Sequence, residues 1–167
     1  QQLHATAAPA PDRDLRPRIA ATEWGQRFEG KLGKRYDIPG ARQGLMWGEC
    51  NDGNSFHAGG TAGNAGLFAT ARDVFRIAQA WTRAELLPRE LVDEATRDQT
   101  AGLDDSLGLG WLIAKPGYGH GGFTGTSVYV DPVSDRIFVL LTNRIHPCAA
   151  PVGMTRIREE FHRLTSR

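Results

Sequence analysis

The sequence predicts an α+β fold in which an antiparallel β-sheet is flanked by helices. Two observations support this class. Segments 107–115, 124–131 and 136–143 are rich in apolar, β-branched and aromatic residues, and the short turn-forming stretches between them are typical of antiparallel hairpins. Segments 71–84 and 150–165 carry apolar residues at helical spacing, which is typical of helices that cover a sheet.

Three helices are expected. The first covers 71–84, where Thr70 can cap the amino end and Asp73 follows three residues later. The second begins at Pro88, a residue suited to the first helical position, and ends near Arg97. The third is a closing helix over 150–165.

The strands differ in their patterns. In the first, Leu107, Leu109, Trp111 and Ile113 alternate with other residues, which predicts one buried face. The glycine-rich stretch 116–123 is expected to be a turn. Segment 136–143 is apolar on both faces, so we expect a central strand with cover on both sides. The whole region 107–143 is therefore expected to form antiparallel strands.

The first part of the chain carries weaker patterns. Residues 1–17, rich in Ala, Pro and charge, are expected to form an extended lead-in. Neither a helical nor a strand period holds over 19–50, which predicts irregular structure. Residues 48–66 are expected to form a glycine-rich loop without regular helix, because glycine suits positive φ and close backbone approach.

Length and composition exclude several classes. The chain has 167 residues, which fits one domain, and a net charge of +1 gives no electrostatic reason to expect nucleic acid as partner. No apolar run approaches the roughly 20 residues of a membrane span. Two cysteines exclude a disulfide-rich scaffold. For Cys50 and Cys148 we expect two buried thiols, while their separation leaves one disulfide open.

Several familiar motifs are absent or misplaced. Gly117, Gly119 and Gly122 match GxGxxG, but a strand-like segment follows, so no helix amino end is available for a pyrophosphate. The histidines show no metal-ligand spacing, and there is no GxSxG elbow. We therefore expect neither a metal nor a cofactor.

Three stretches together resemble the superfamily of serine β-lactamases and penicillin-binding proteins, in particular class C β-lactamase-like esterases and peptidases. Residues 58–81 resemble the family's glycine-rich loop and the capped helix after it. Residues 119–132 resemble its third active-site motif, a Lys- or His-x-Gly triplet on a strand. Residues 137–147 resemble the following strand and its TNR-x-HP exit. The resemblance implies that the α+β sheet is part of a β-lactamase/transpeptidase-like fold.

The third motif supplies the candidate site. The resemblance places His120 where the family commonly has Lys, and a histidine there can donate a hydrogen bond to the nucleophile or to the substrate. Small residues let an extended acyl substrate lie beside the strand. The backbone N–H of Phe123 would stabilise a tetrahedral oxyanion. The predicted catalytic residues are therefore His120 and Phe123, and the predicted substrate-binding residues are Gly121, Gly122, Thr124, Gly125 and Asn143. For Asn143, hydrogen bonds that cap the strand remain an equal alternative.

The chain departs from the family in its nucleophile. No serine is followed three residues later by Lys, and no Tyr-x-Asn occurs. In the family both motifs precede the glycine-rich loop, so the resemblance implies that residues 1–167 are the C-terminal portion of one β-lactamase-like domain. Covalent catalysis needs nucleophile and base together, so we expect the chain to be inactive alone.

Three functional interpretations follow. The first is the C-terminal part of a serine hydrolase that transfers an acyl group from an ester, amide or β-lactam to water. Its partners would be a small-molecule or peptide acyl substrate and the N-terminal part of the same protein. The second is a non-catalytic homologue that binds a ligand or partner, and the third is an unrelated α+β binding domain. The resemblance alone suggests a periplasmic or secreted location.

Overall fold

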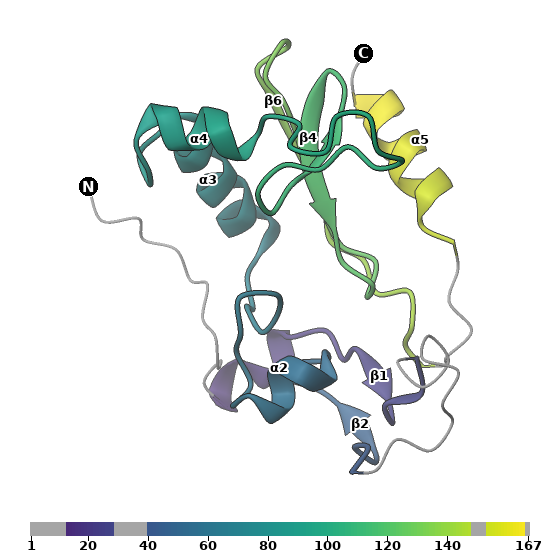
Figure 1. Ribbon diagram of the computed structural model, residues 1–167. Coiled ribbons are helices and arrows are strands. Elements are labelled where there is room, and N and C mark those ends of the chain that lie inside the picture. Colours follow the sequence, from purple (N-terminus) through teal and green to yellow (C-terminus); the bar gives the residue numbers. More distant parts are fainter. Residues whose placement is uncertain (1–12, 29–39, 148–152, 166–167) are drawn as a thin grey trace. The chain divides into compact units, whose positions relative to one another are not determined.

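The computed structural model describes residues 13–28, 40–147 and 153–165 (Figure 1). They form two compact units, which are described separately. The first unit comprises Ala71–Leu141 and a helix that begins at Thr155, and the second comprises the other described residues. Helices and antiparallel sheets confirm the predicted α+β class. Among the described helices, none has the length and apolar character needed to span a bilayer.

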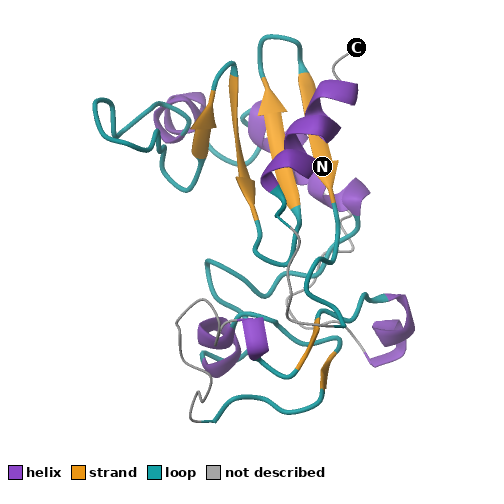
Figure 2. Ribbon diagram, turned by 90° about the vertical axis from the view of Figure 1, so that its right-hand side faces the viewer, coloured by secondary structure: helices purple, strands orange, loops and turns teal. Residues whose placement is uncertain are grey.

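The first unit is built on a four-stranded antiparallel sheet whose strands follow chain order (Figure 2). The strands are β3 (Leu112–Ala114), β4 (Gly117–Gly121), β5 (Ser127–Asp131) and β6 (Arg136–Leu140). Tyr118 pairs with Val130, and Tyr129 pairs with Phe138. The predicted hairpins are confirmed, although 124–126 and 141–143 lie outside the strands.

The predicted turn over 116–123 is wrong, because β4 occupies most of it. Gly117 and Gly119 are buried, and a Cβ at either position would collide with a carbonyl oxygen of β5, that of Val130 or Val128. Glycine therefore lets the two backbones approach closely. The same glycines remove the alternating side chains by which a strand is predicted from sequence.

The first predicted strand is also shorter than expected. Leu107 makes only an isolated bridge to Leu112, and the chain turns at Gly110, which has a φ of +79°. Leu109 is 59% exposed, so its predicted place on a buried face is wrong. Ile113 does pack against the core.

Helices cover both faces of this sheet. The helices of this unit are α3 (Ala71–Thr82), α4 (Arg89–Ala95) and α5 (Thr155–Thr165), of which α3 and α5 contact the sheet. On one face α3 contacts β5 and β6, and the buried core there contains Ala78, Tyr118 and Val130. The predicted helices are present with shorter bounds. Pro88 is the residue before α4 rather than its first, and the predicted start of α5 falls on residues outside the described ones.

The other face is organised by Tyr129 (β5). Its hydroxyl donates to the Ala114 carbonyl (2.8 Å) and accepts from the Gly117 N–H (3.1 Å). The His162 ring of α5 stacks on the Tyr129 ring with centroids 4.9 Å apart and lies 5.5 Å from the Phe138 ring. These aromatic contacts dock α5, which Figure 2 shows in front of the sheet.

The predicted cover on both faces of β6 is observed, but its predicted central position is wrong within the described sheet. Ile137 packs towards the α3 core, whereas Phe138 contacts His162 of α5. In the strand order, however, β6 is an edge. A strand between two helices is apolar on both faces, so this pattern cannot distinguish an edge from a centre.

The second unit contains short elements. They are η1 (Arg13–Arg18), β1 (Glu23–Trp24), β2 (Leu45–Met46) and α2 (Gly53–His57). The extended lead-in predicted over 1–17 is wrong at its end, where η1 is a 3-10 helix, and residues 1–12 lie outside the described ones. The predicted absence of helix in 48–66 is also wrong, because Asp52 caps α2 by accepting the Ser55 N–H (2.8 Å).

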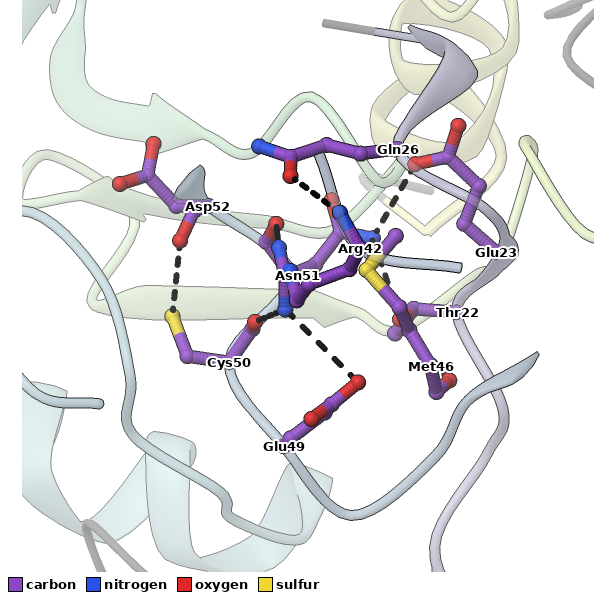
Figure 3. A network of polar contacts seen from close by, with 9 residues as sticks. All are labelled: Thr22, Glu23, Gln26, Arg42, Met46, Glu49, Cys50, Asn51 and Asp52. Carbon is purple, nitrogen blue, oxygen red and sulfur yellow. Dashed lines mark hydrogen bonds and ion pairs between the residues drawn. The ribbon is translucent and has the colours of Figure 1, made fainter. Parts of the chain in front are cut away.

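Polar contacts around Arg42 hold the second unit together (Figure 3). Its guanidinium donates to the carbonyl oxygens of Cys50 and Asn51 and lies 4.2 Å from the Phe56 ring centroid. Asn51 in turn donates to the carboxylate of Glu23 (3.4 Å), which is 2% exposed and accepts the Phe28 N–H (2.5 Å). Irregular backbone is thus paired through side chains, as buried carbonyls require.

Cys50 should be unreactive in the folded chain. It is a free thiol, 5% exposed, and burial raises its pKa, which lowers the fraction of reactive thiolate. We expect iodoacetamide at about pH 8 to label it at least ~10-fold more slowly in the folded chain than in urea. Mass spectrometry of the Cys50 peptide measures both rates, with a synthetic peptide of the same residues as control. Equal rates would contradict the buried position.

His162 should make the stability depend on pH. Burial and, to a lesser degree, the Arg158 guanidinium lower the pKa of its imidazole. Below about pH 6.5 the unfolded chain then binds a proton that the folded chain resists, so stability is lost as the pH falls. Urea unfolding should show a smaller decrease between about pH 7.5 and about pH 5 for His162→Phe than for the wild type. The matched control, His57→Phe at an exposed residue, should keep the wild-type decrease; equal decreases in all three would contradict the role of His162.

Candidate active site

The first part of the site is the carboxyl end of β4. His120 is exposed and pairs with Val128 of β5, whereas its neighbour Gly119 is buried. On the opposite side of β4, β3 pairs only with residues 117–119, and its last pair is Leu112 with Gly119. Within the described residues, His120 and Gly121 therefore have no strand partner on that side. The sequence hypothesis placed an extended substrate beside a strand with small residues, and within the described residues β4 has open backbone only at this end.

The second part is the tight turn that follows. The Gly125 N–H donates to the Gly122 carbonyl (3.0 Å), which makes Phe123 and Thr124 the two central residues. The Gly122 N–H also donates to the Thr126 carbonyl (2.8 Å). Gly125 has a φ of +111°, which favours glycine there.

The structure gives an internal reason for the two glycines before the turn. A Cβ at Gly121 would lie 2.9 Å from the guanidinium carbon of Arg158, and one at Gly122 would lie 2.5 Å from Oγ1 of Thr126. At either position an added side chain would therefore displace a neighbouring side chain within the unit. The sequence hypothesis attributed them to substrate approach, and that role stays a prediction.

Arg158 of α5 is the residue that sequence reasoning missed. Its Nη2 donates to the carbonyl oxygens of both Gly122 and Thr126, each at 2.8 Å. It lies 36 residues beyond Gly122 on a helix that already contains several charged residues. Nothing in that helical pattern distinguishes Arg158 from its solvent-facing neighbours, so only the fold could identify it.

Asn143 belongs to the second unit, whereas the other predicted site residues belong to the first. Its side-chain amide donates to the Ala21 carbonyl, and its oxygen accepts the His146 N–H (3.3 Å). Neither partner belongs to β6, so these bonds do not cap the strand. Substrate binding by Asn143 stays a prediction.

Other candidate groups, for a metal site or for a serine nucleophile, have weaker support. The described residues contain no group of three His, Cys, Asp or Glu side chains that could hold a metal ion. Ser55 is 0% exposed and donates to the Asn64 side-chain oxygen (3.1 Å), and Ser134 donates to the Asp131 carboxylate (2.6 Å). Neither serine contacts a lysine or histidine in these bonds, and such a base is what activates a serine nucleophile.

Comparisons with known proteins show the family of the chain. A family model described as Beta-lactamase matches residues 4–160. Two curated relatives, from Salmonella agona (strain SL483) and Salmonella typhi, are each named "Putative D-alanyl-D-alanine carboxypeptidase". Each is 32% identical over 158 residues, which covers 81% of this chain and 35% of the relative. The chain thus spans 35% of the length of these relatives.

The family match extends over nearly the whole chain, including β4, the turn and the first part of α5, up to residue 160. It agrees with the α+β architecture of the described residues. The chain belongs to the β-lactamase family, within the superfamily of serine β-lactamases and penicillin-binding proteins.

Proposed function

We propose that this chain is the C-terminal, substrate-facing part of a serine hydrolase that transfers an acyl group to water. The observation that carries the proposal is the open backbone at His120 and Gly121, followed directly by a turn centred on Phe123 and Thr124. An extended acyl group can pair with such an edge, as a further strand would. The N–H of Phe123 would then meet the carbonyl oxygen at the end of the strand.

The reaction proposed is acyl transfer in two steps. A serine hydroxyl adds to the substrate carbonyl and loses its proton to a base, and the C–N or C–O bond breaks as the leaving group takes a proton. Water then hydrolyses the acyl-enzyme and restores the serine. In this chain the Phe123 N–H stabilises the oxyanion of both steps, and His120 donates a hydrogen bond near the nucleophile or substrate.

The nucleophile is proposed to lie in the N-terminal part of the same protein. No serine of residues 1–167 has a lysine three positions later. Two features of the first unit support an additional packing partner. The outer edge of β6 lacks a strand partner among the described residues, and a groove beside it is lined by Phe75, Ile137, Val139 and Phe161 together with the charged Asp135 and Arg136.

The relatives' names favour one substrate class. Because they are named as D-alanyl-D-alanine carboxypeptidases, we propose a peptide amide ending in D-alanine as the substrate to test first. β-Lactams and simple esters react by the same acyl transfer and serve as comparison substrates. A non-catalytic homologue is the alternative that the experiments below would reveal.

Acylation should require the complete protein and the Phe123 N–H. We expect a fluorescent penicillin to label the full-length protein at a serine outside residues 1–167 and to leave the 167-residue chain unlabelled. In the full-length protein, Phe123→Pro should slow acylation by about 100- to 1000-fold, because it removes one oxyanion donor at a turn position that accepts proline. Phe123→Ala, which keeps the N–H, is the matched control.

Labelling rates and the labelled peptide are measured by gel fluorescence and mass spectrometry. Equal rates for Phe123→Pro and Phe123→Ala would remove Phe123 from the oxyanion site. Stoichiometric labelling of any serine in the isolated chain would overturn the proposed nucleophile. A full-length protein that binds D-alanyl peptides without hydrolysis would favour the non-catalytic homologue.

The isolated chain should also expose the groove beside β6. Phe75 is 38% exposed there, so we expect self-association that increases with concentration, together with binding of a hydrophobic dye. Phe75→Glu should reduce both effects, whereas Leu103→Glu, at a side chain 73% exposed and outside the groove, should not. Sedimentation velocity at several concentrations measures association. A compact monomer without dye binding and with one sharp unfolding transition would show that the chain is self-sufficient.

A further inference from the structure

Arg158 joins the carbonyl oxygens that define the turn after β4. The Gly122 carbonyl accepts the Gly125 N–H, and the Thr126 carbonyl accepts the Gly122 N–H. Both carbonyls also accept a hydrogen bond from Nη2 of Arg158, at 2.8 Å each. One nitrogen of one side chain therefore contacts the first residue of the turn and the residue just after it.

We propose that Arg158 is a positioning residue for acyl transfer, a role that rests on the proposed function. It contacts neither substrate nor reacting atoms. Instead, it fixes the turn from α5, and the turn carries the Phe123 N–H. An oxyanion donor acts only when it is held within a few tenths of an ångström of the productive geometry, and misplacement by about 1 Å can cost about 100-fold in rate.

The geometry favours arginine over lysine at this position. The guanidinium lies beside Gly121, where an added Cβ would be 2.9 Å from both Cζ and Nη1. A planar guanidinium can lie against a glycine backbone while its nitrogen donates to two carbonyls. A lysine ammonium is a compact, strongly hydrated group on a flexible stem, so it would not hold both carbonyls in one orientation.

The packing around Arg158 is equally specific. Gly121 pairs with Ser127 at the start of β5, so Arg158 contacts the point where the β4–β5 connection begins and ends. One turn later on α5, His162 stacks on Tyr129. The same helix thus docks on the sheet through His162 and reaches the turn through Arg158. Loss of Arg158 leaves the aromatic contact in place, so its effect can be separated from loss of the helix.

The test uses the full-length protein and three variants. Arg158→Met keeps much of the apolar stem and removes the donors, Arg158→Lys keeps the charge, and Arg156→Met is the control at an exposed arginine of the same helix. Amide hydrogen exchange measures the turn, and stopped-flow acylation by a fluorescent penicillin measures the rate constant. The final labelled fraction gives the share of correctly folded protein.

For Arg158→Met we expect exchange of the turn amides to rise at least ~10-fold and the acylation rate constant to fall about 10- to 100-fold, with an unchanged labelled fraction. Arg158→Lys should lie between it and the wild type, and Arg156→Met should match the wild type. A merely structural role would lower the labelled fraction and leave the rate constant of the folded protein unchanged, which would overturn the proposal. Unchanged exchange of the turn would overturn it as well.

The two proposals fail in distinguishable ways. If the wild-type protein is not acylated by penicillin, D-alanyl peptide or ester, the proposed function is overturned, and the positioning role in catalysis is overturned with it. Hydrogen exchange would still decide whether Arg158 holds the turn. If the wild type is acylated and Arg158→Met is acylated at the same rate, only the role of Arg158 is overturned.

Discussion

The absence of side chains on one face of β4 is the constraint on which the α5 side of the sheet depends. Gly117, Gly119 and Gly121 share that face, and added Cβ atoms would collide with β5 or with Arg158. Because the face is bare, the Tyr129 hydroxyl can reach the backbone at Ala114 and Gly117. The ring of Tyr129 then gives His162 a surface on which to stack. Close backbone packing, rather than a large apolar cluster, thus sets how α5 lies against the sheet.

Sequence patterns predicted the elements whose side chains face one apolar layer. Helix α3 and the β5–β6 hairpin are examples, because their spacing follows directly from burial on one or both faces. The patterns gave wrong predictions where tertiary packing determines the secondary structure. A turn was predicted in place of β4 because its glycines, which allow close contact with β5, are typical of turns. Helix α2 was not predicted because it is so short that one cap at Asp52 is enough to start it. The edge position of β6 could not be predicted, since two covering helices give it a central pattern.

The residues of the candidate site also include some that the sequence predicted and some that it could not. His120, Gly121, Gly122 and Phe123 are contiguous, so one motif was enough to predict that they lie together. Arg158 lies 36 residues after Gly122 and donates its hydrogen bonds to backbone carbonyls there. Because a carbonyl is present at every residue, the sequence around the motif does not indicate this contact. Asn143 was chosen from a strand exit, and its bond to Ala21 joins residues 122 positions apart, whereas its bond to His146 is local. Long-range main-chain contacts are therefore what sequence reasoning lacked. Both compact units also use an arginine to bind main-chain carbonyls, Arg42 over eight and nine positions in the chain and Arg158 over 36 and 32.

The chain-order arrangement of β3, β4, β5 and β6 has a consequence for the order of folding. Each strand pairs only with its sequence neighbours, so the meander can form through short loop closures. Arg158 lies after all four strands in the chain, so during synthesis it leaves the ribosome later than the sheet does. The sheet can therefore assemble while the turn at 122–126 still lacks its guanidinium. In this order of folding, the turn gains its hydrogen bonds from Arg158 after the sheet has formed. A nascent chain halted before residue 158 would contain the folded sheet but would lack these hydrogen bonds.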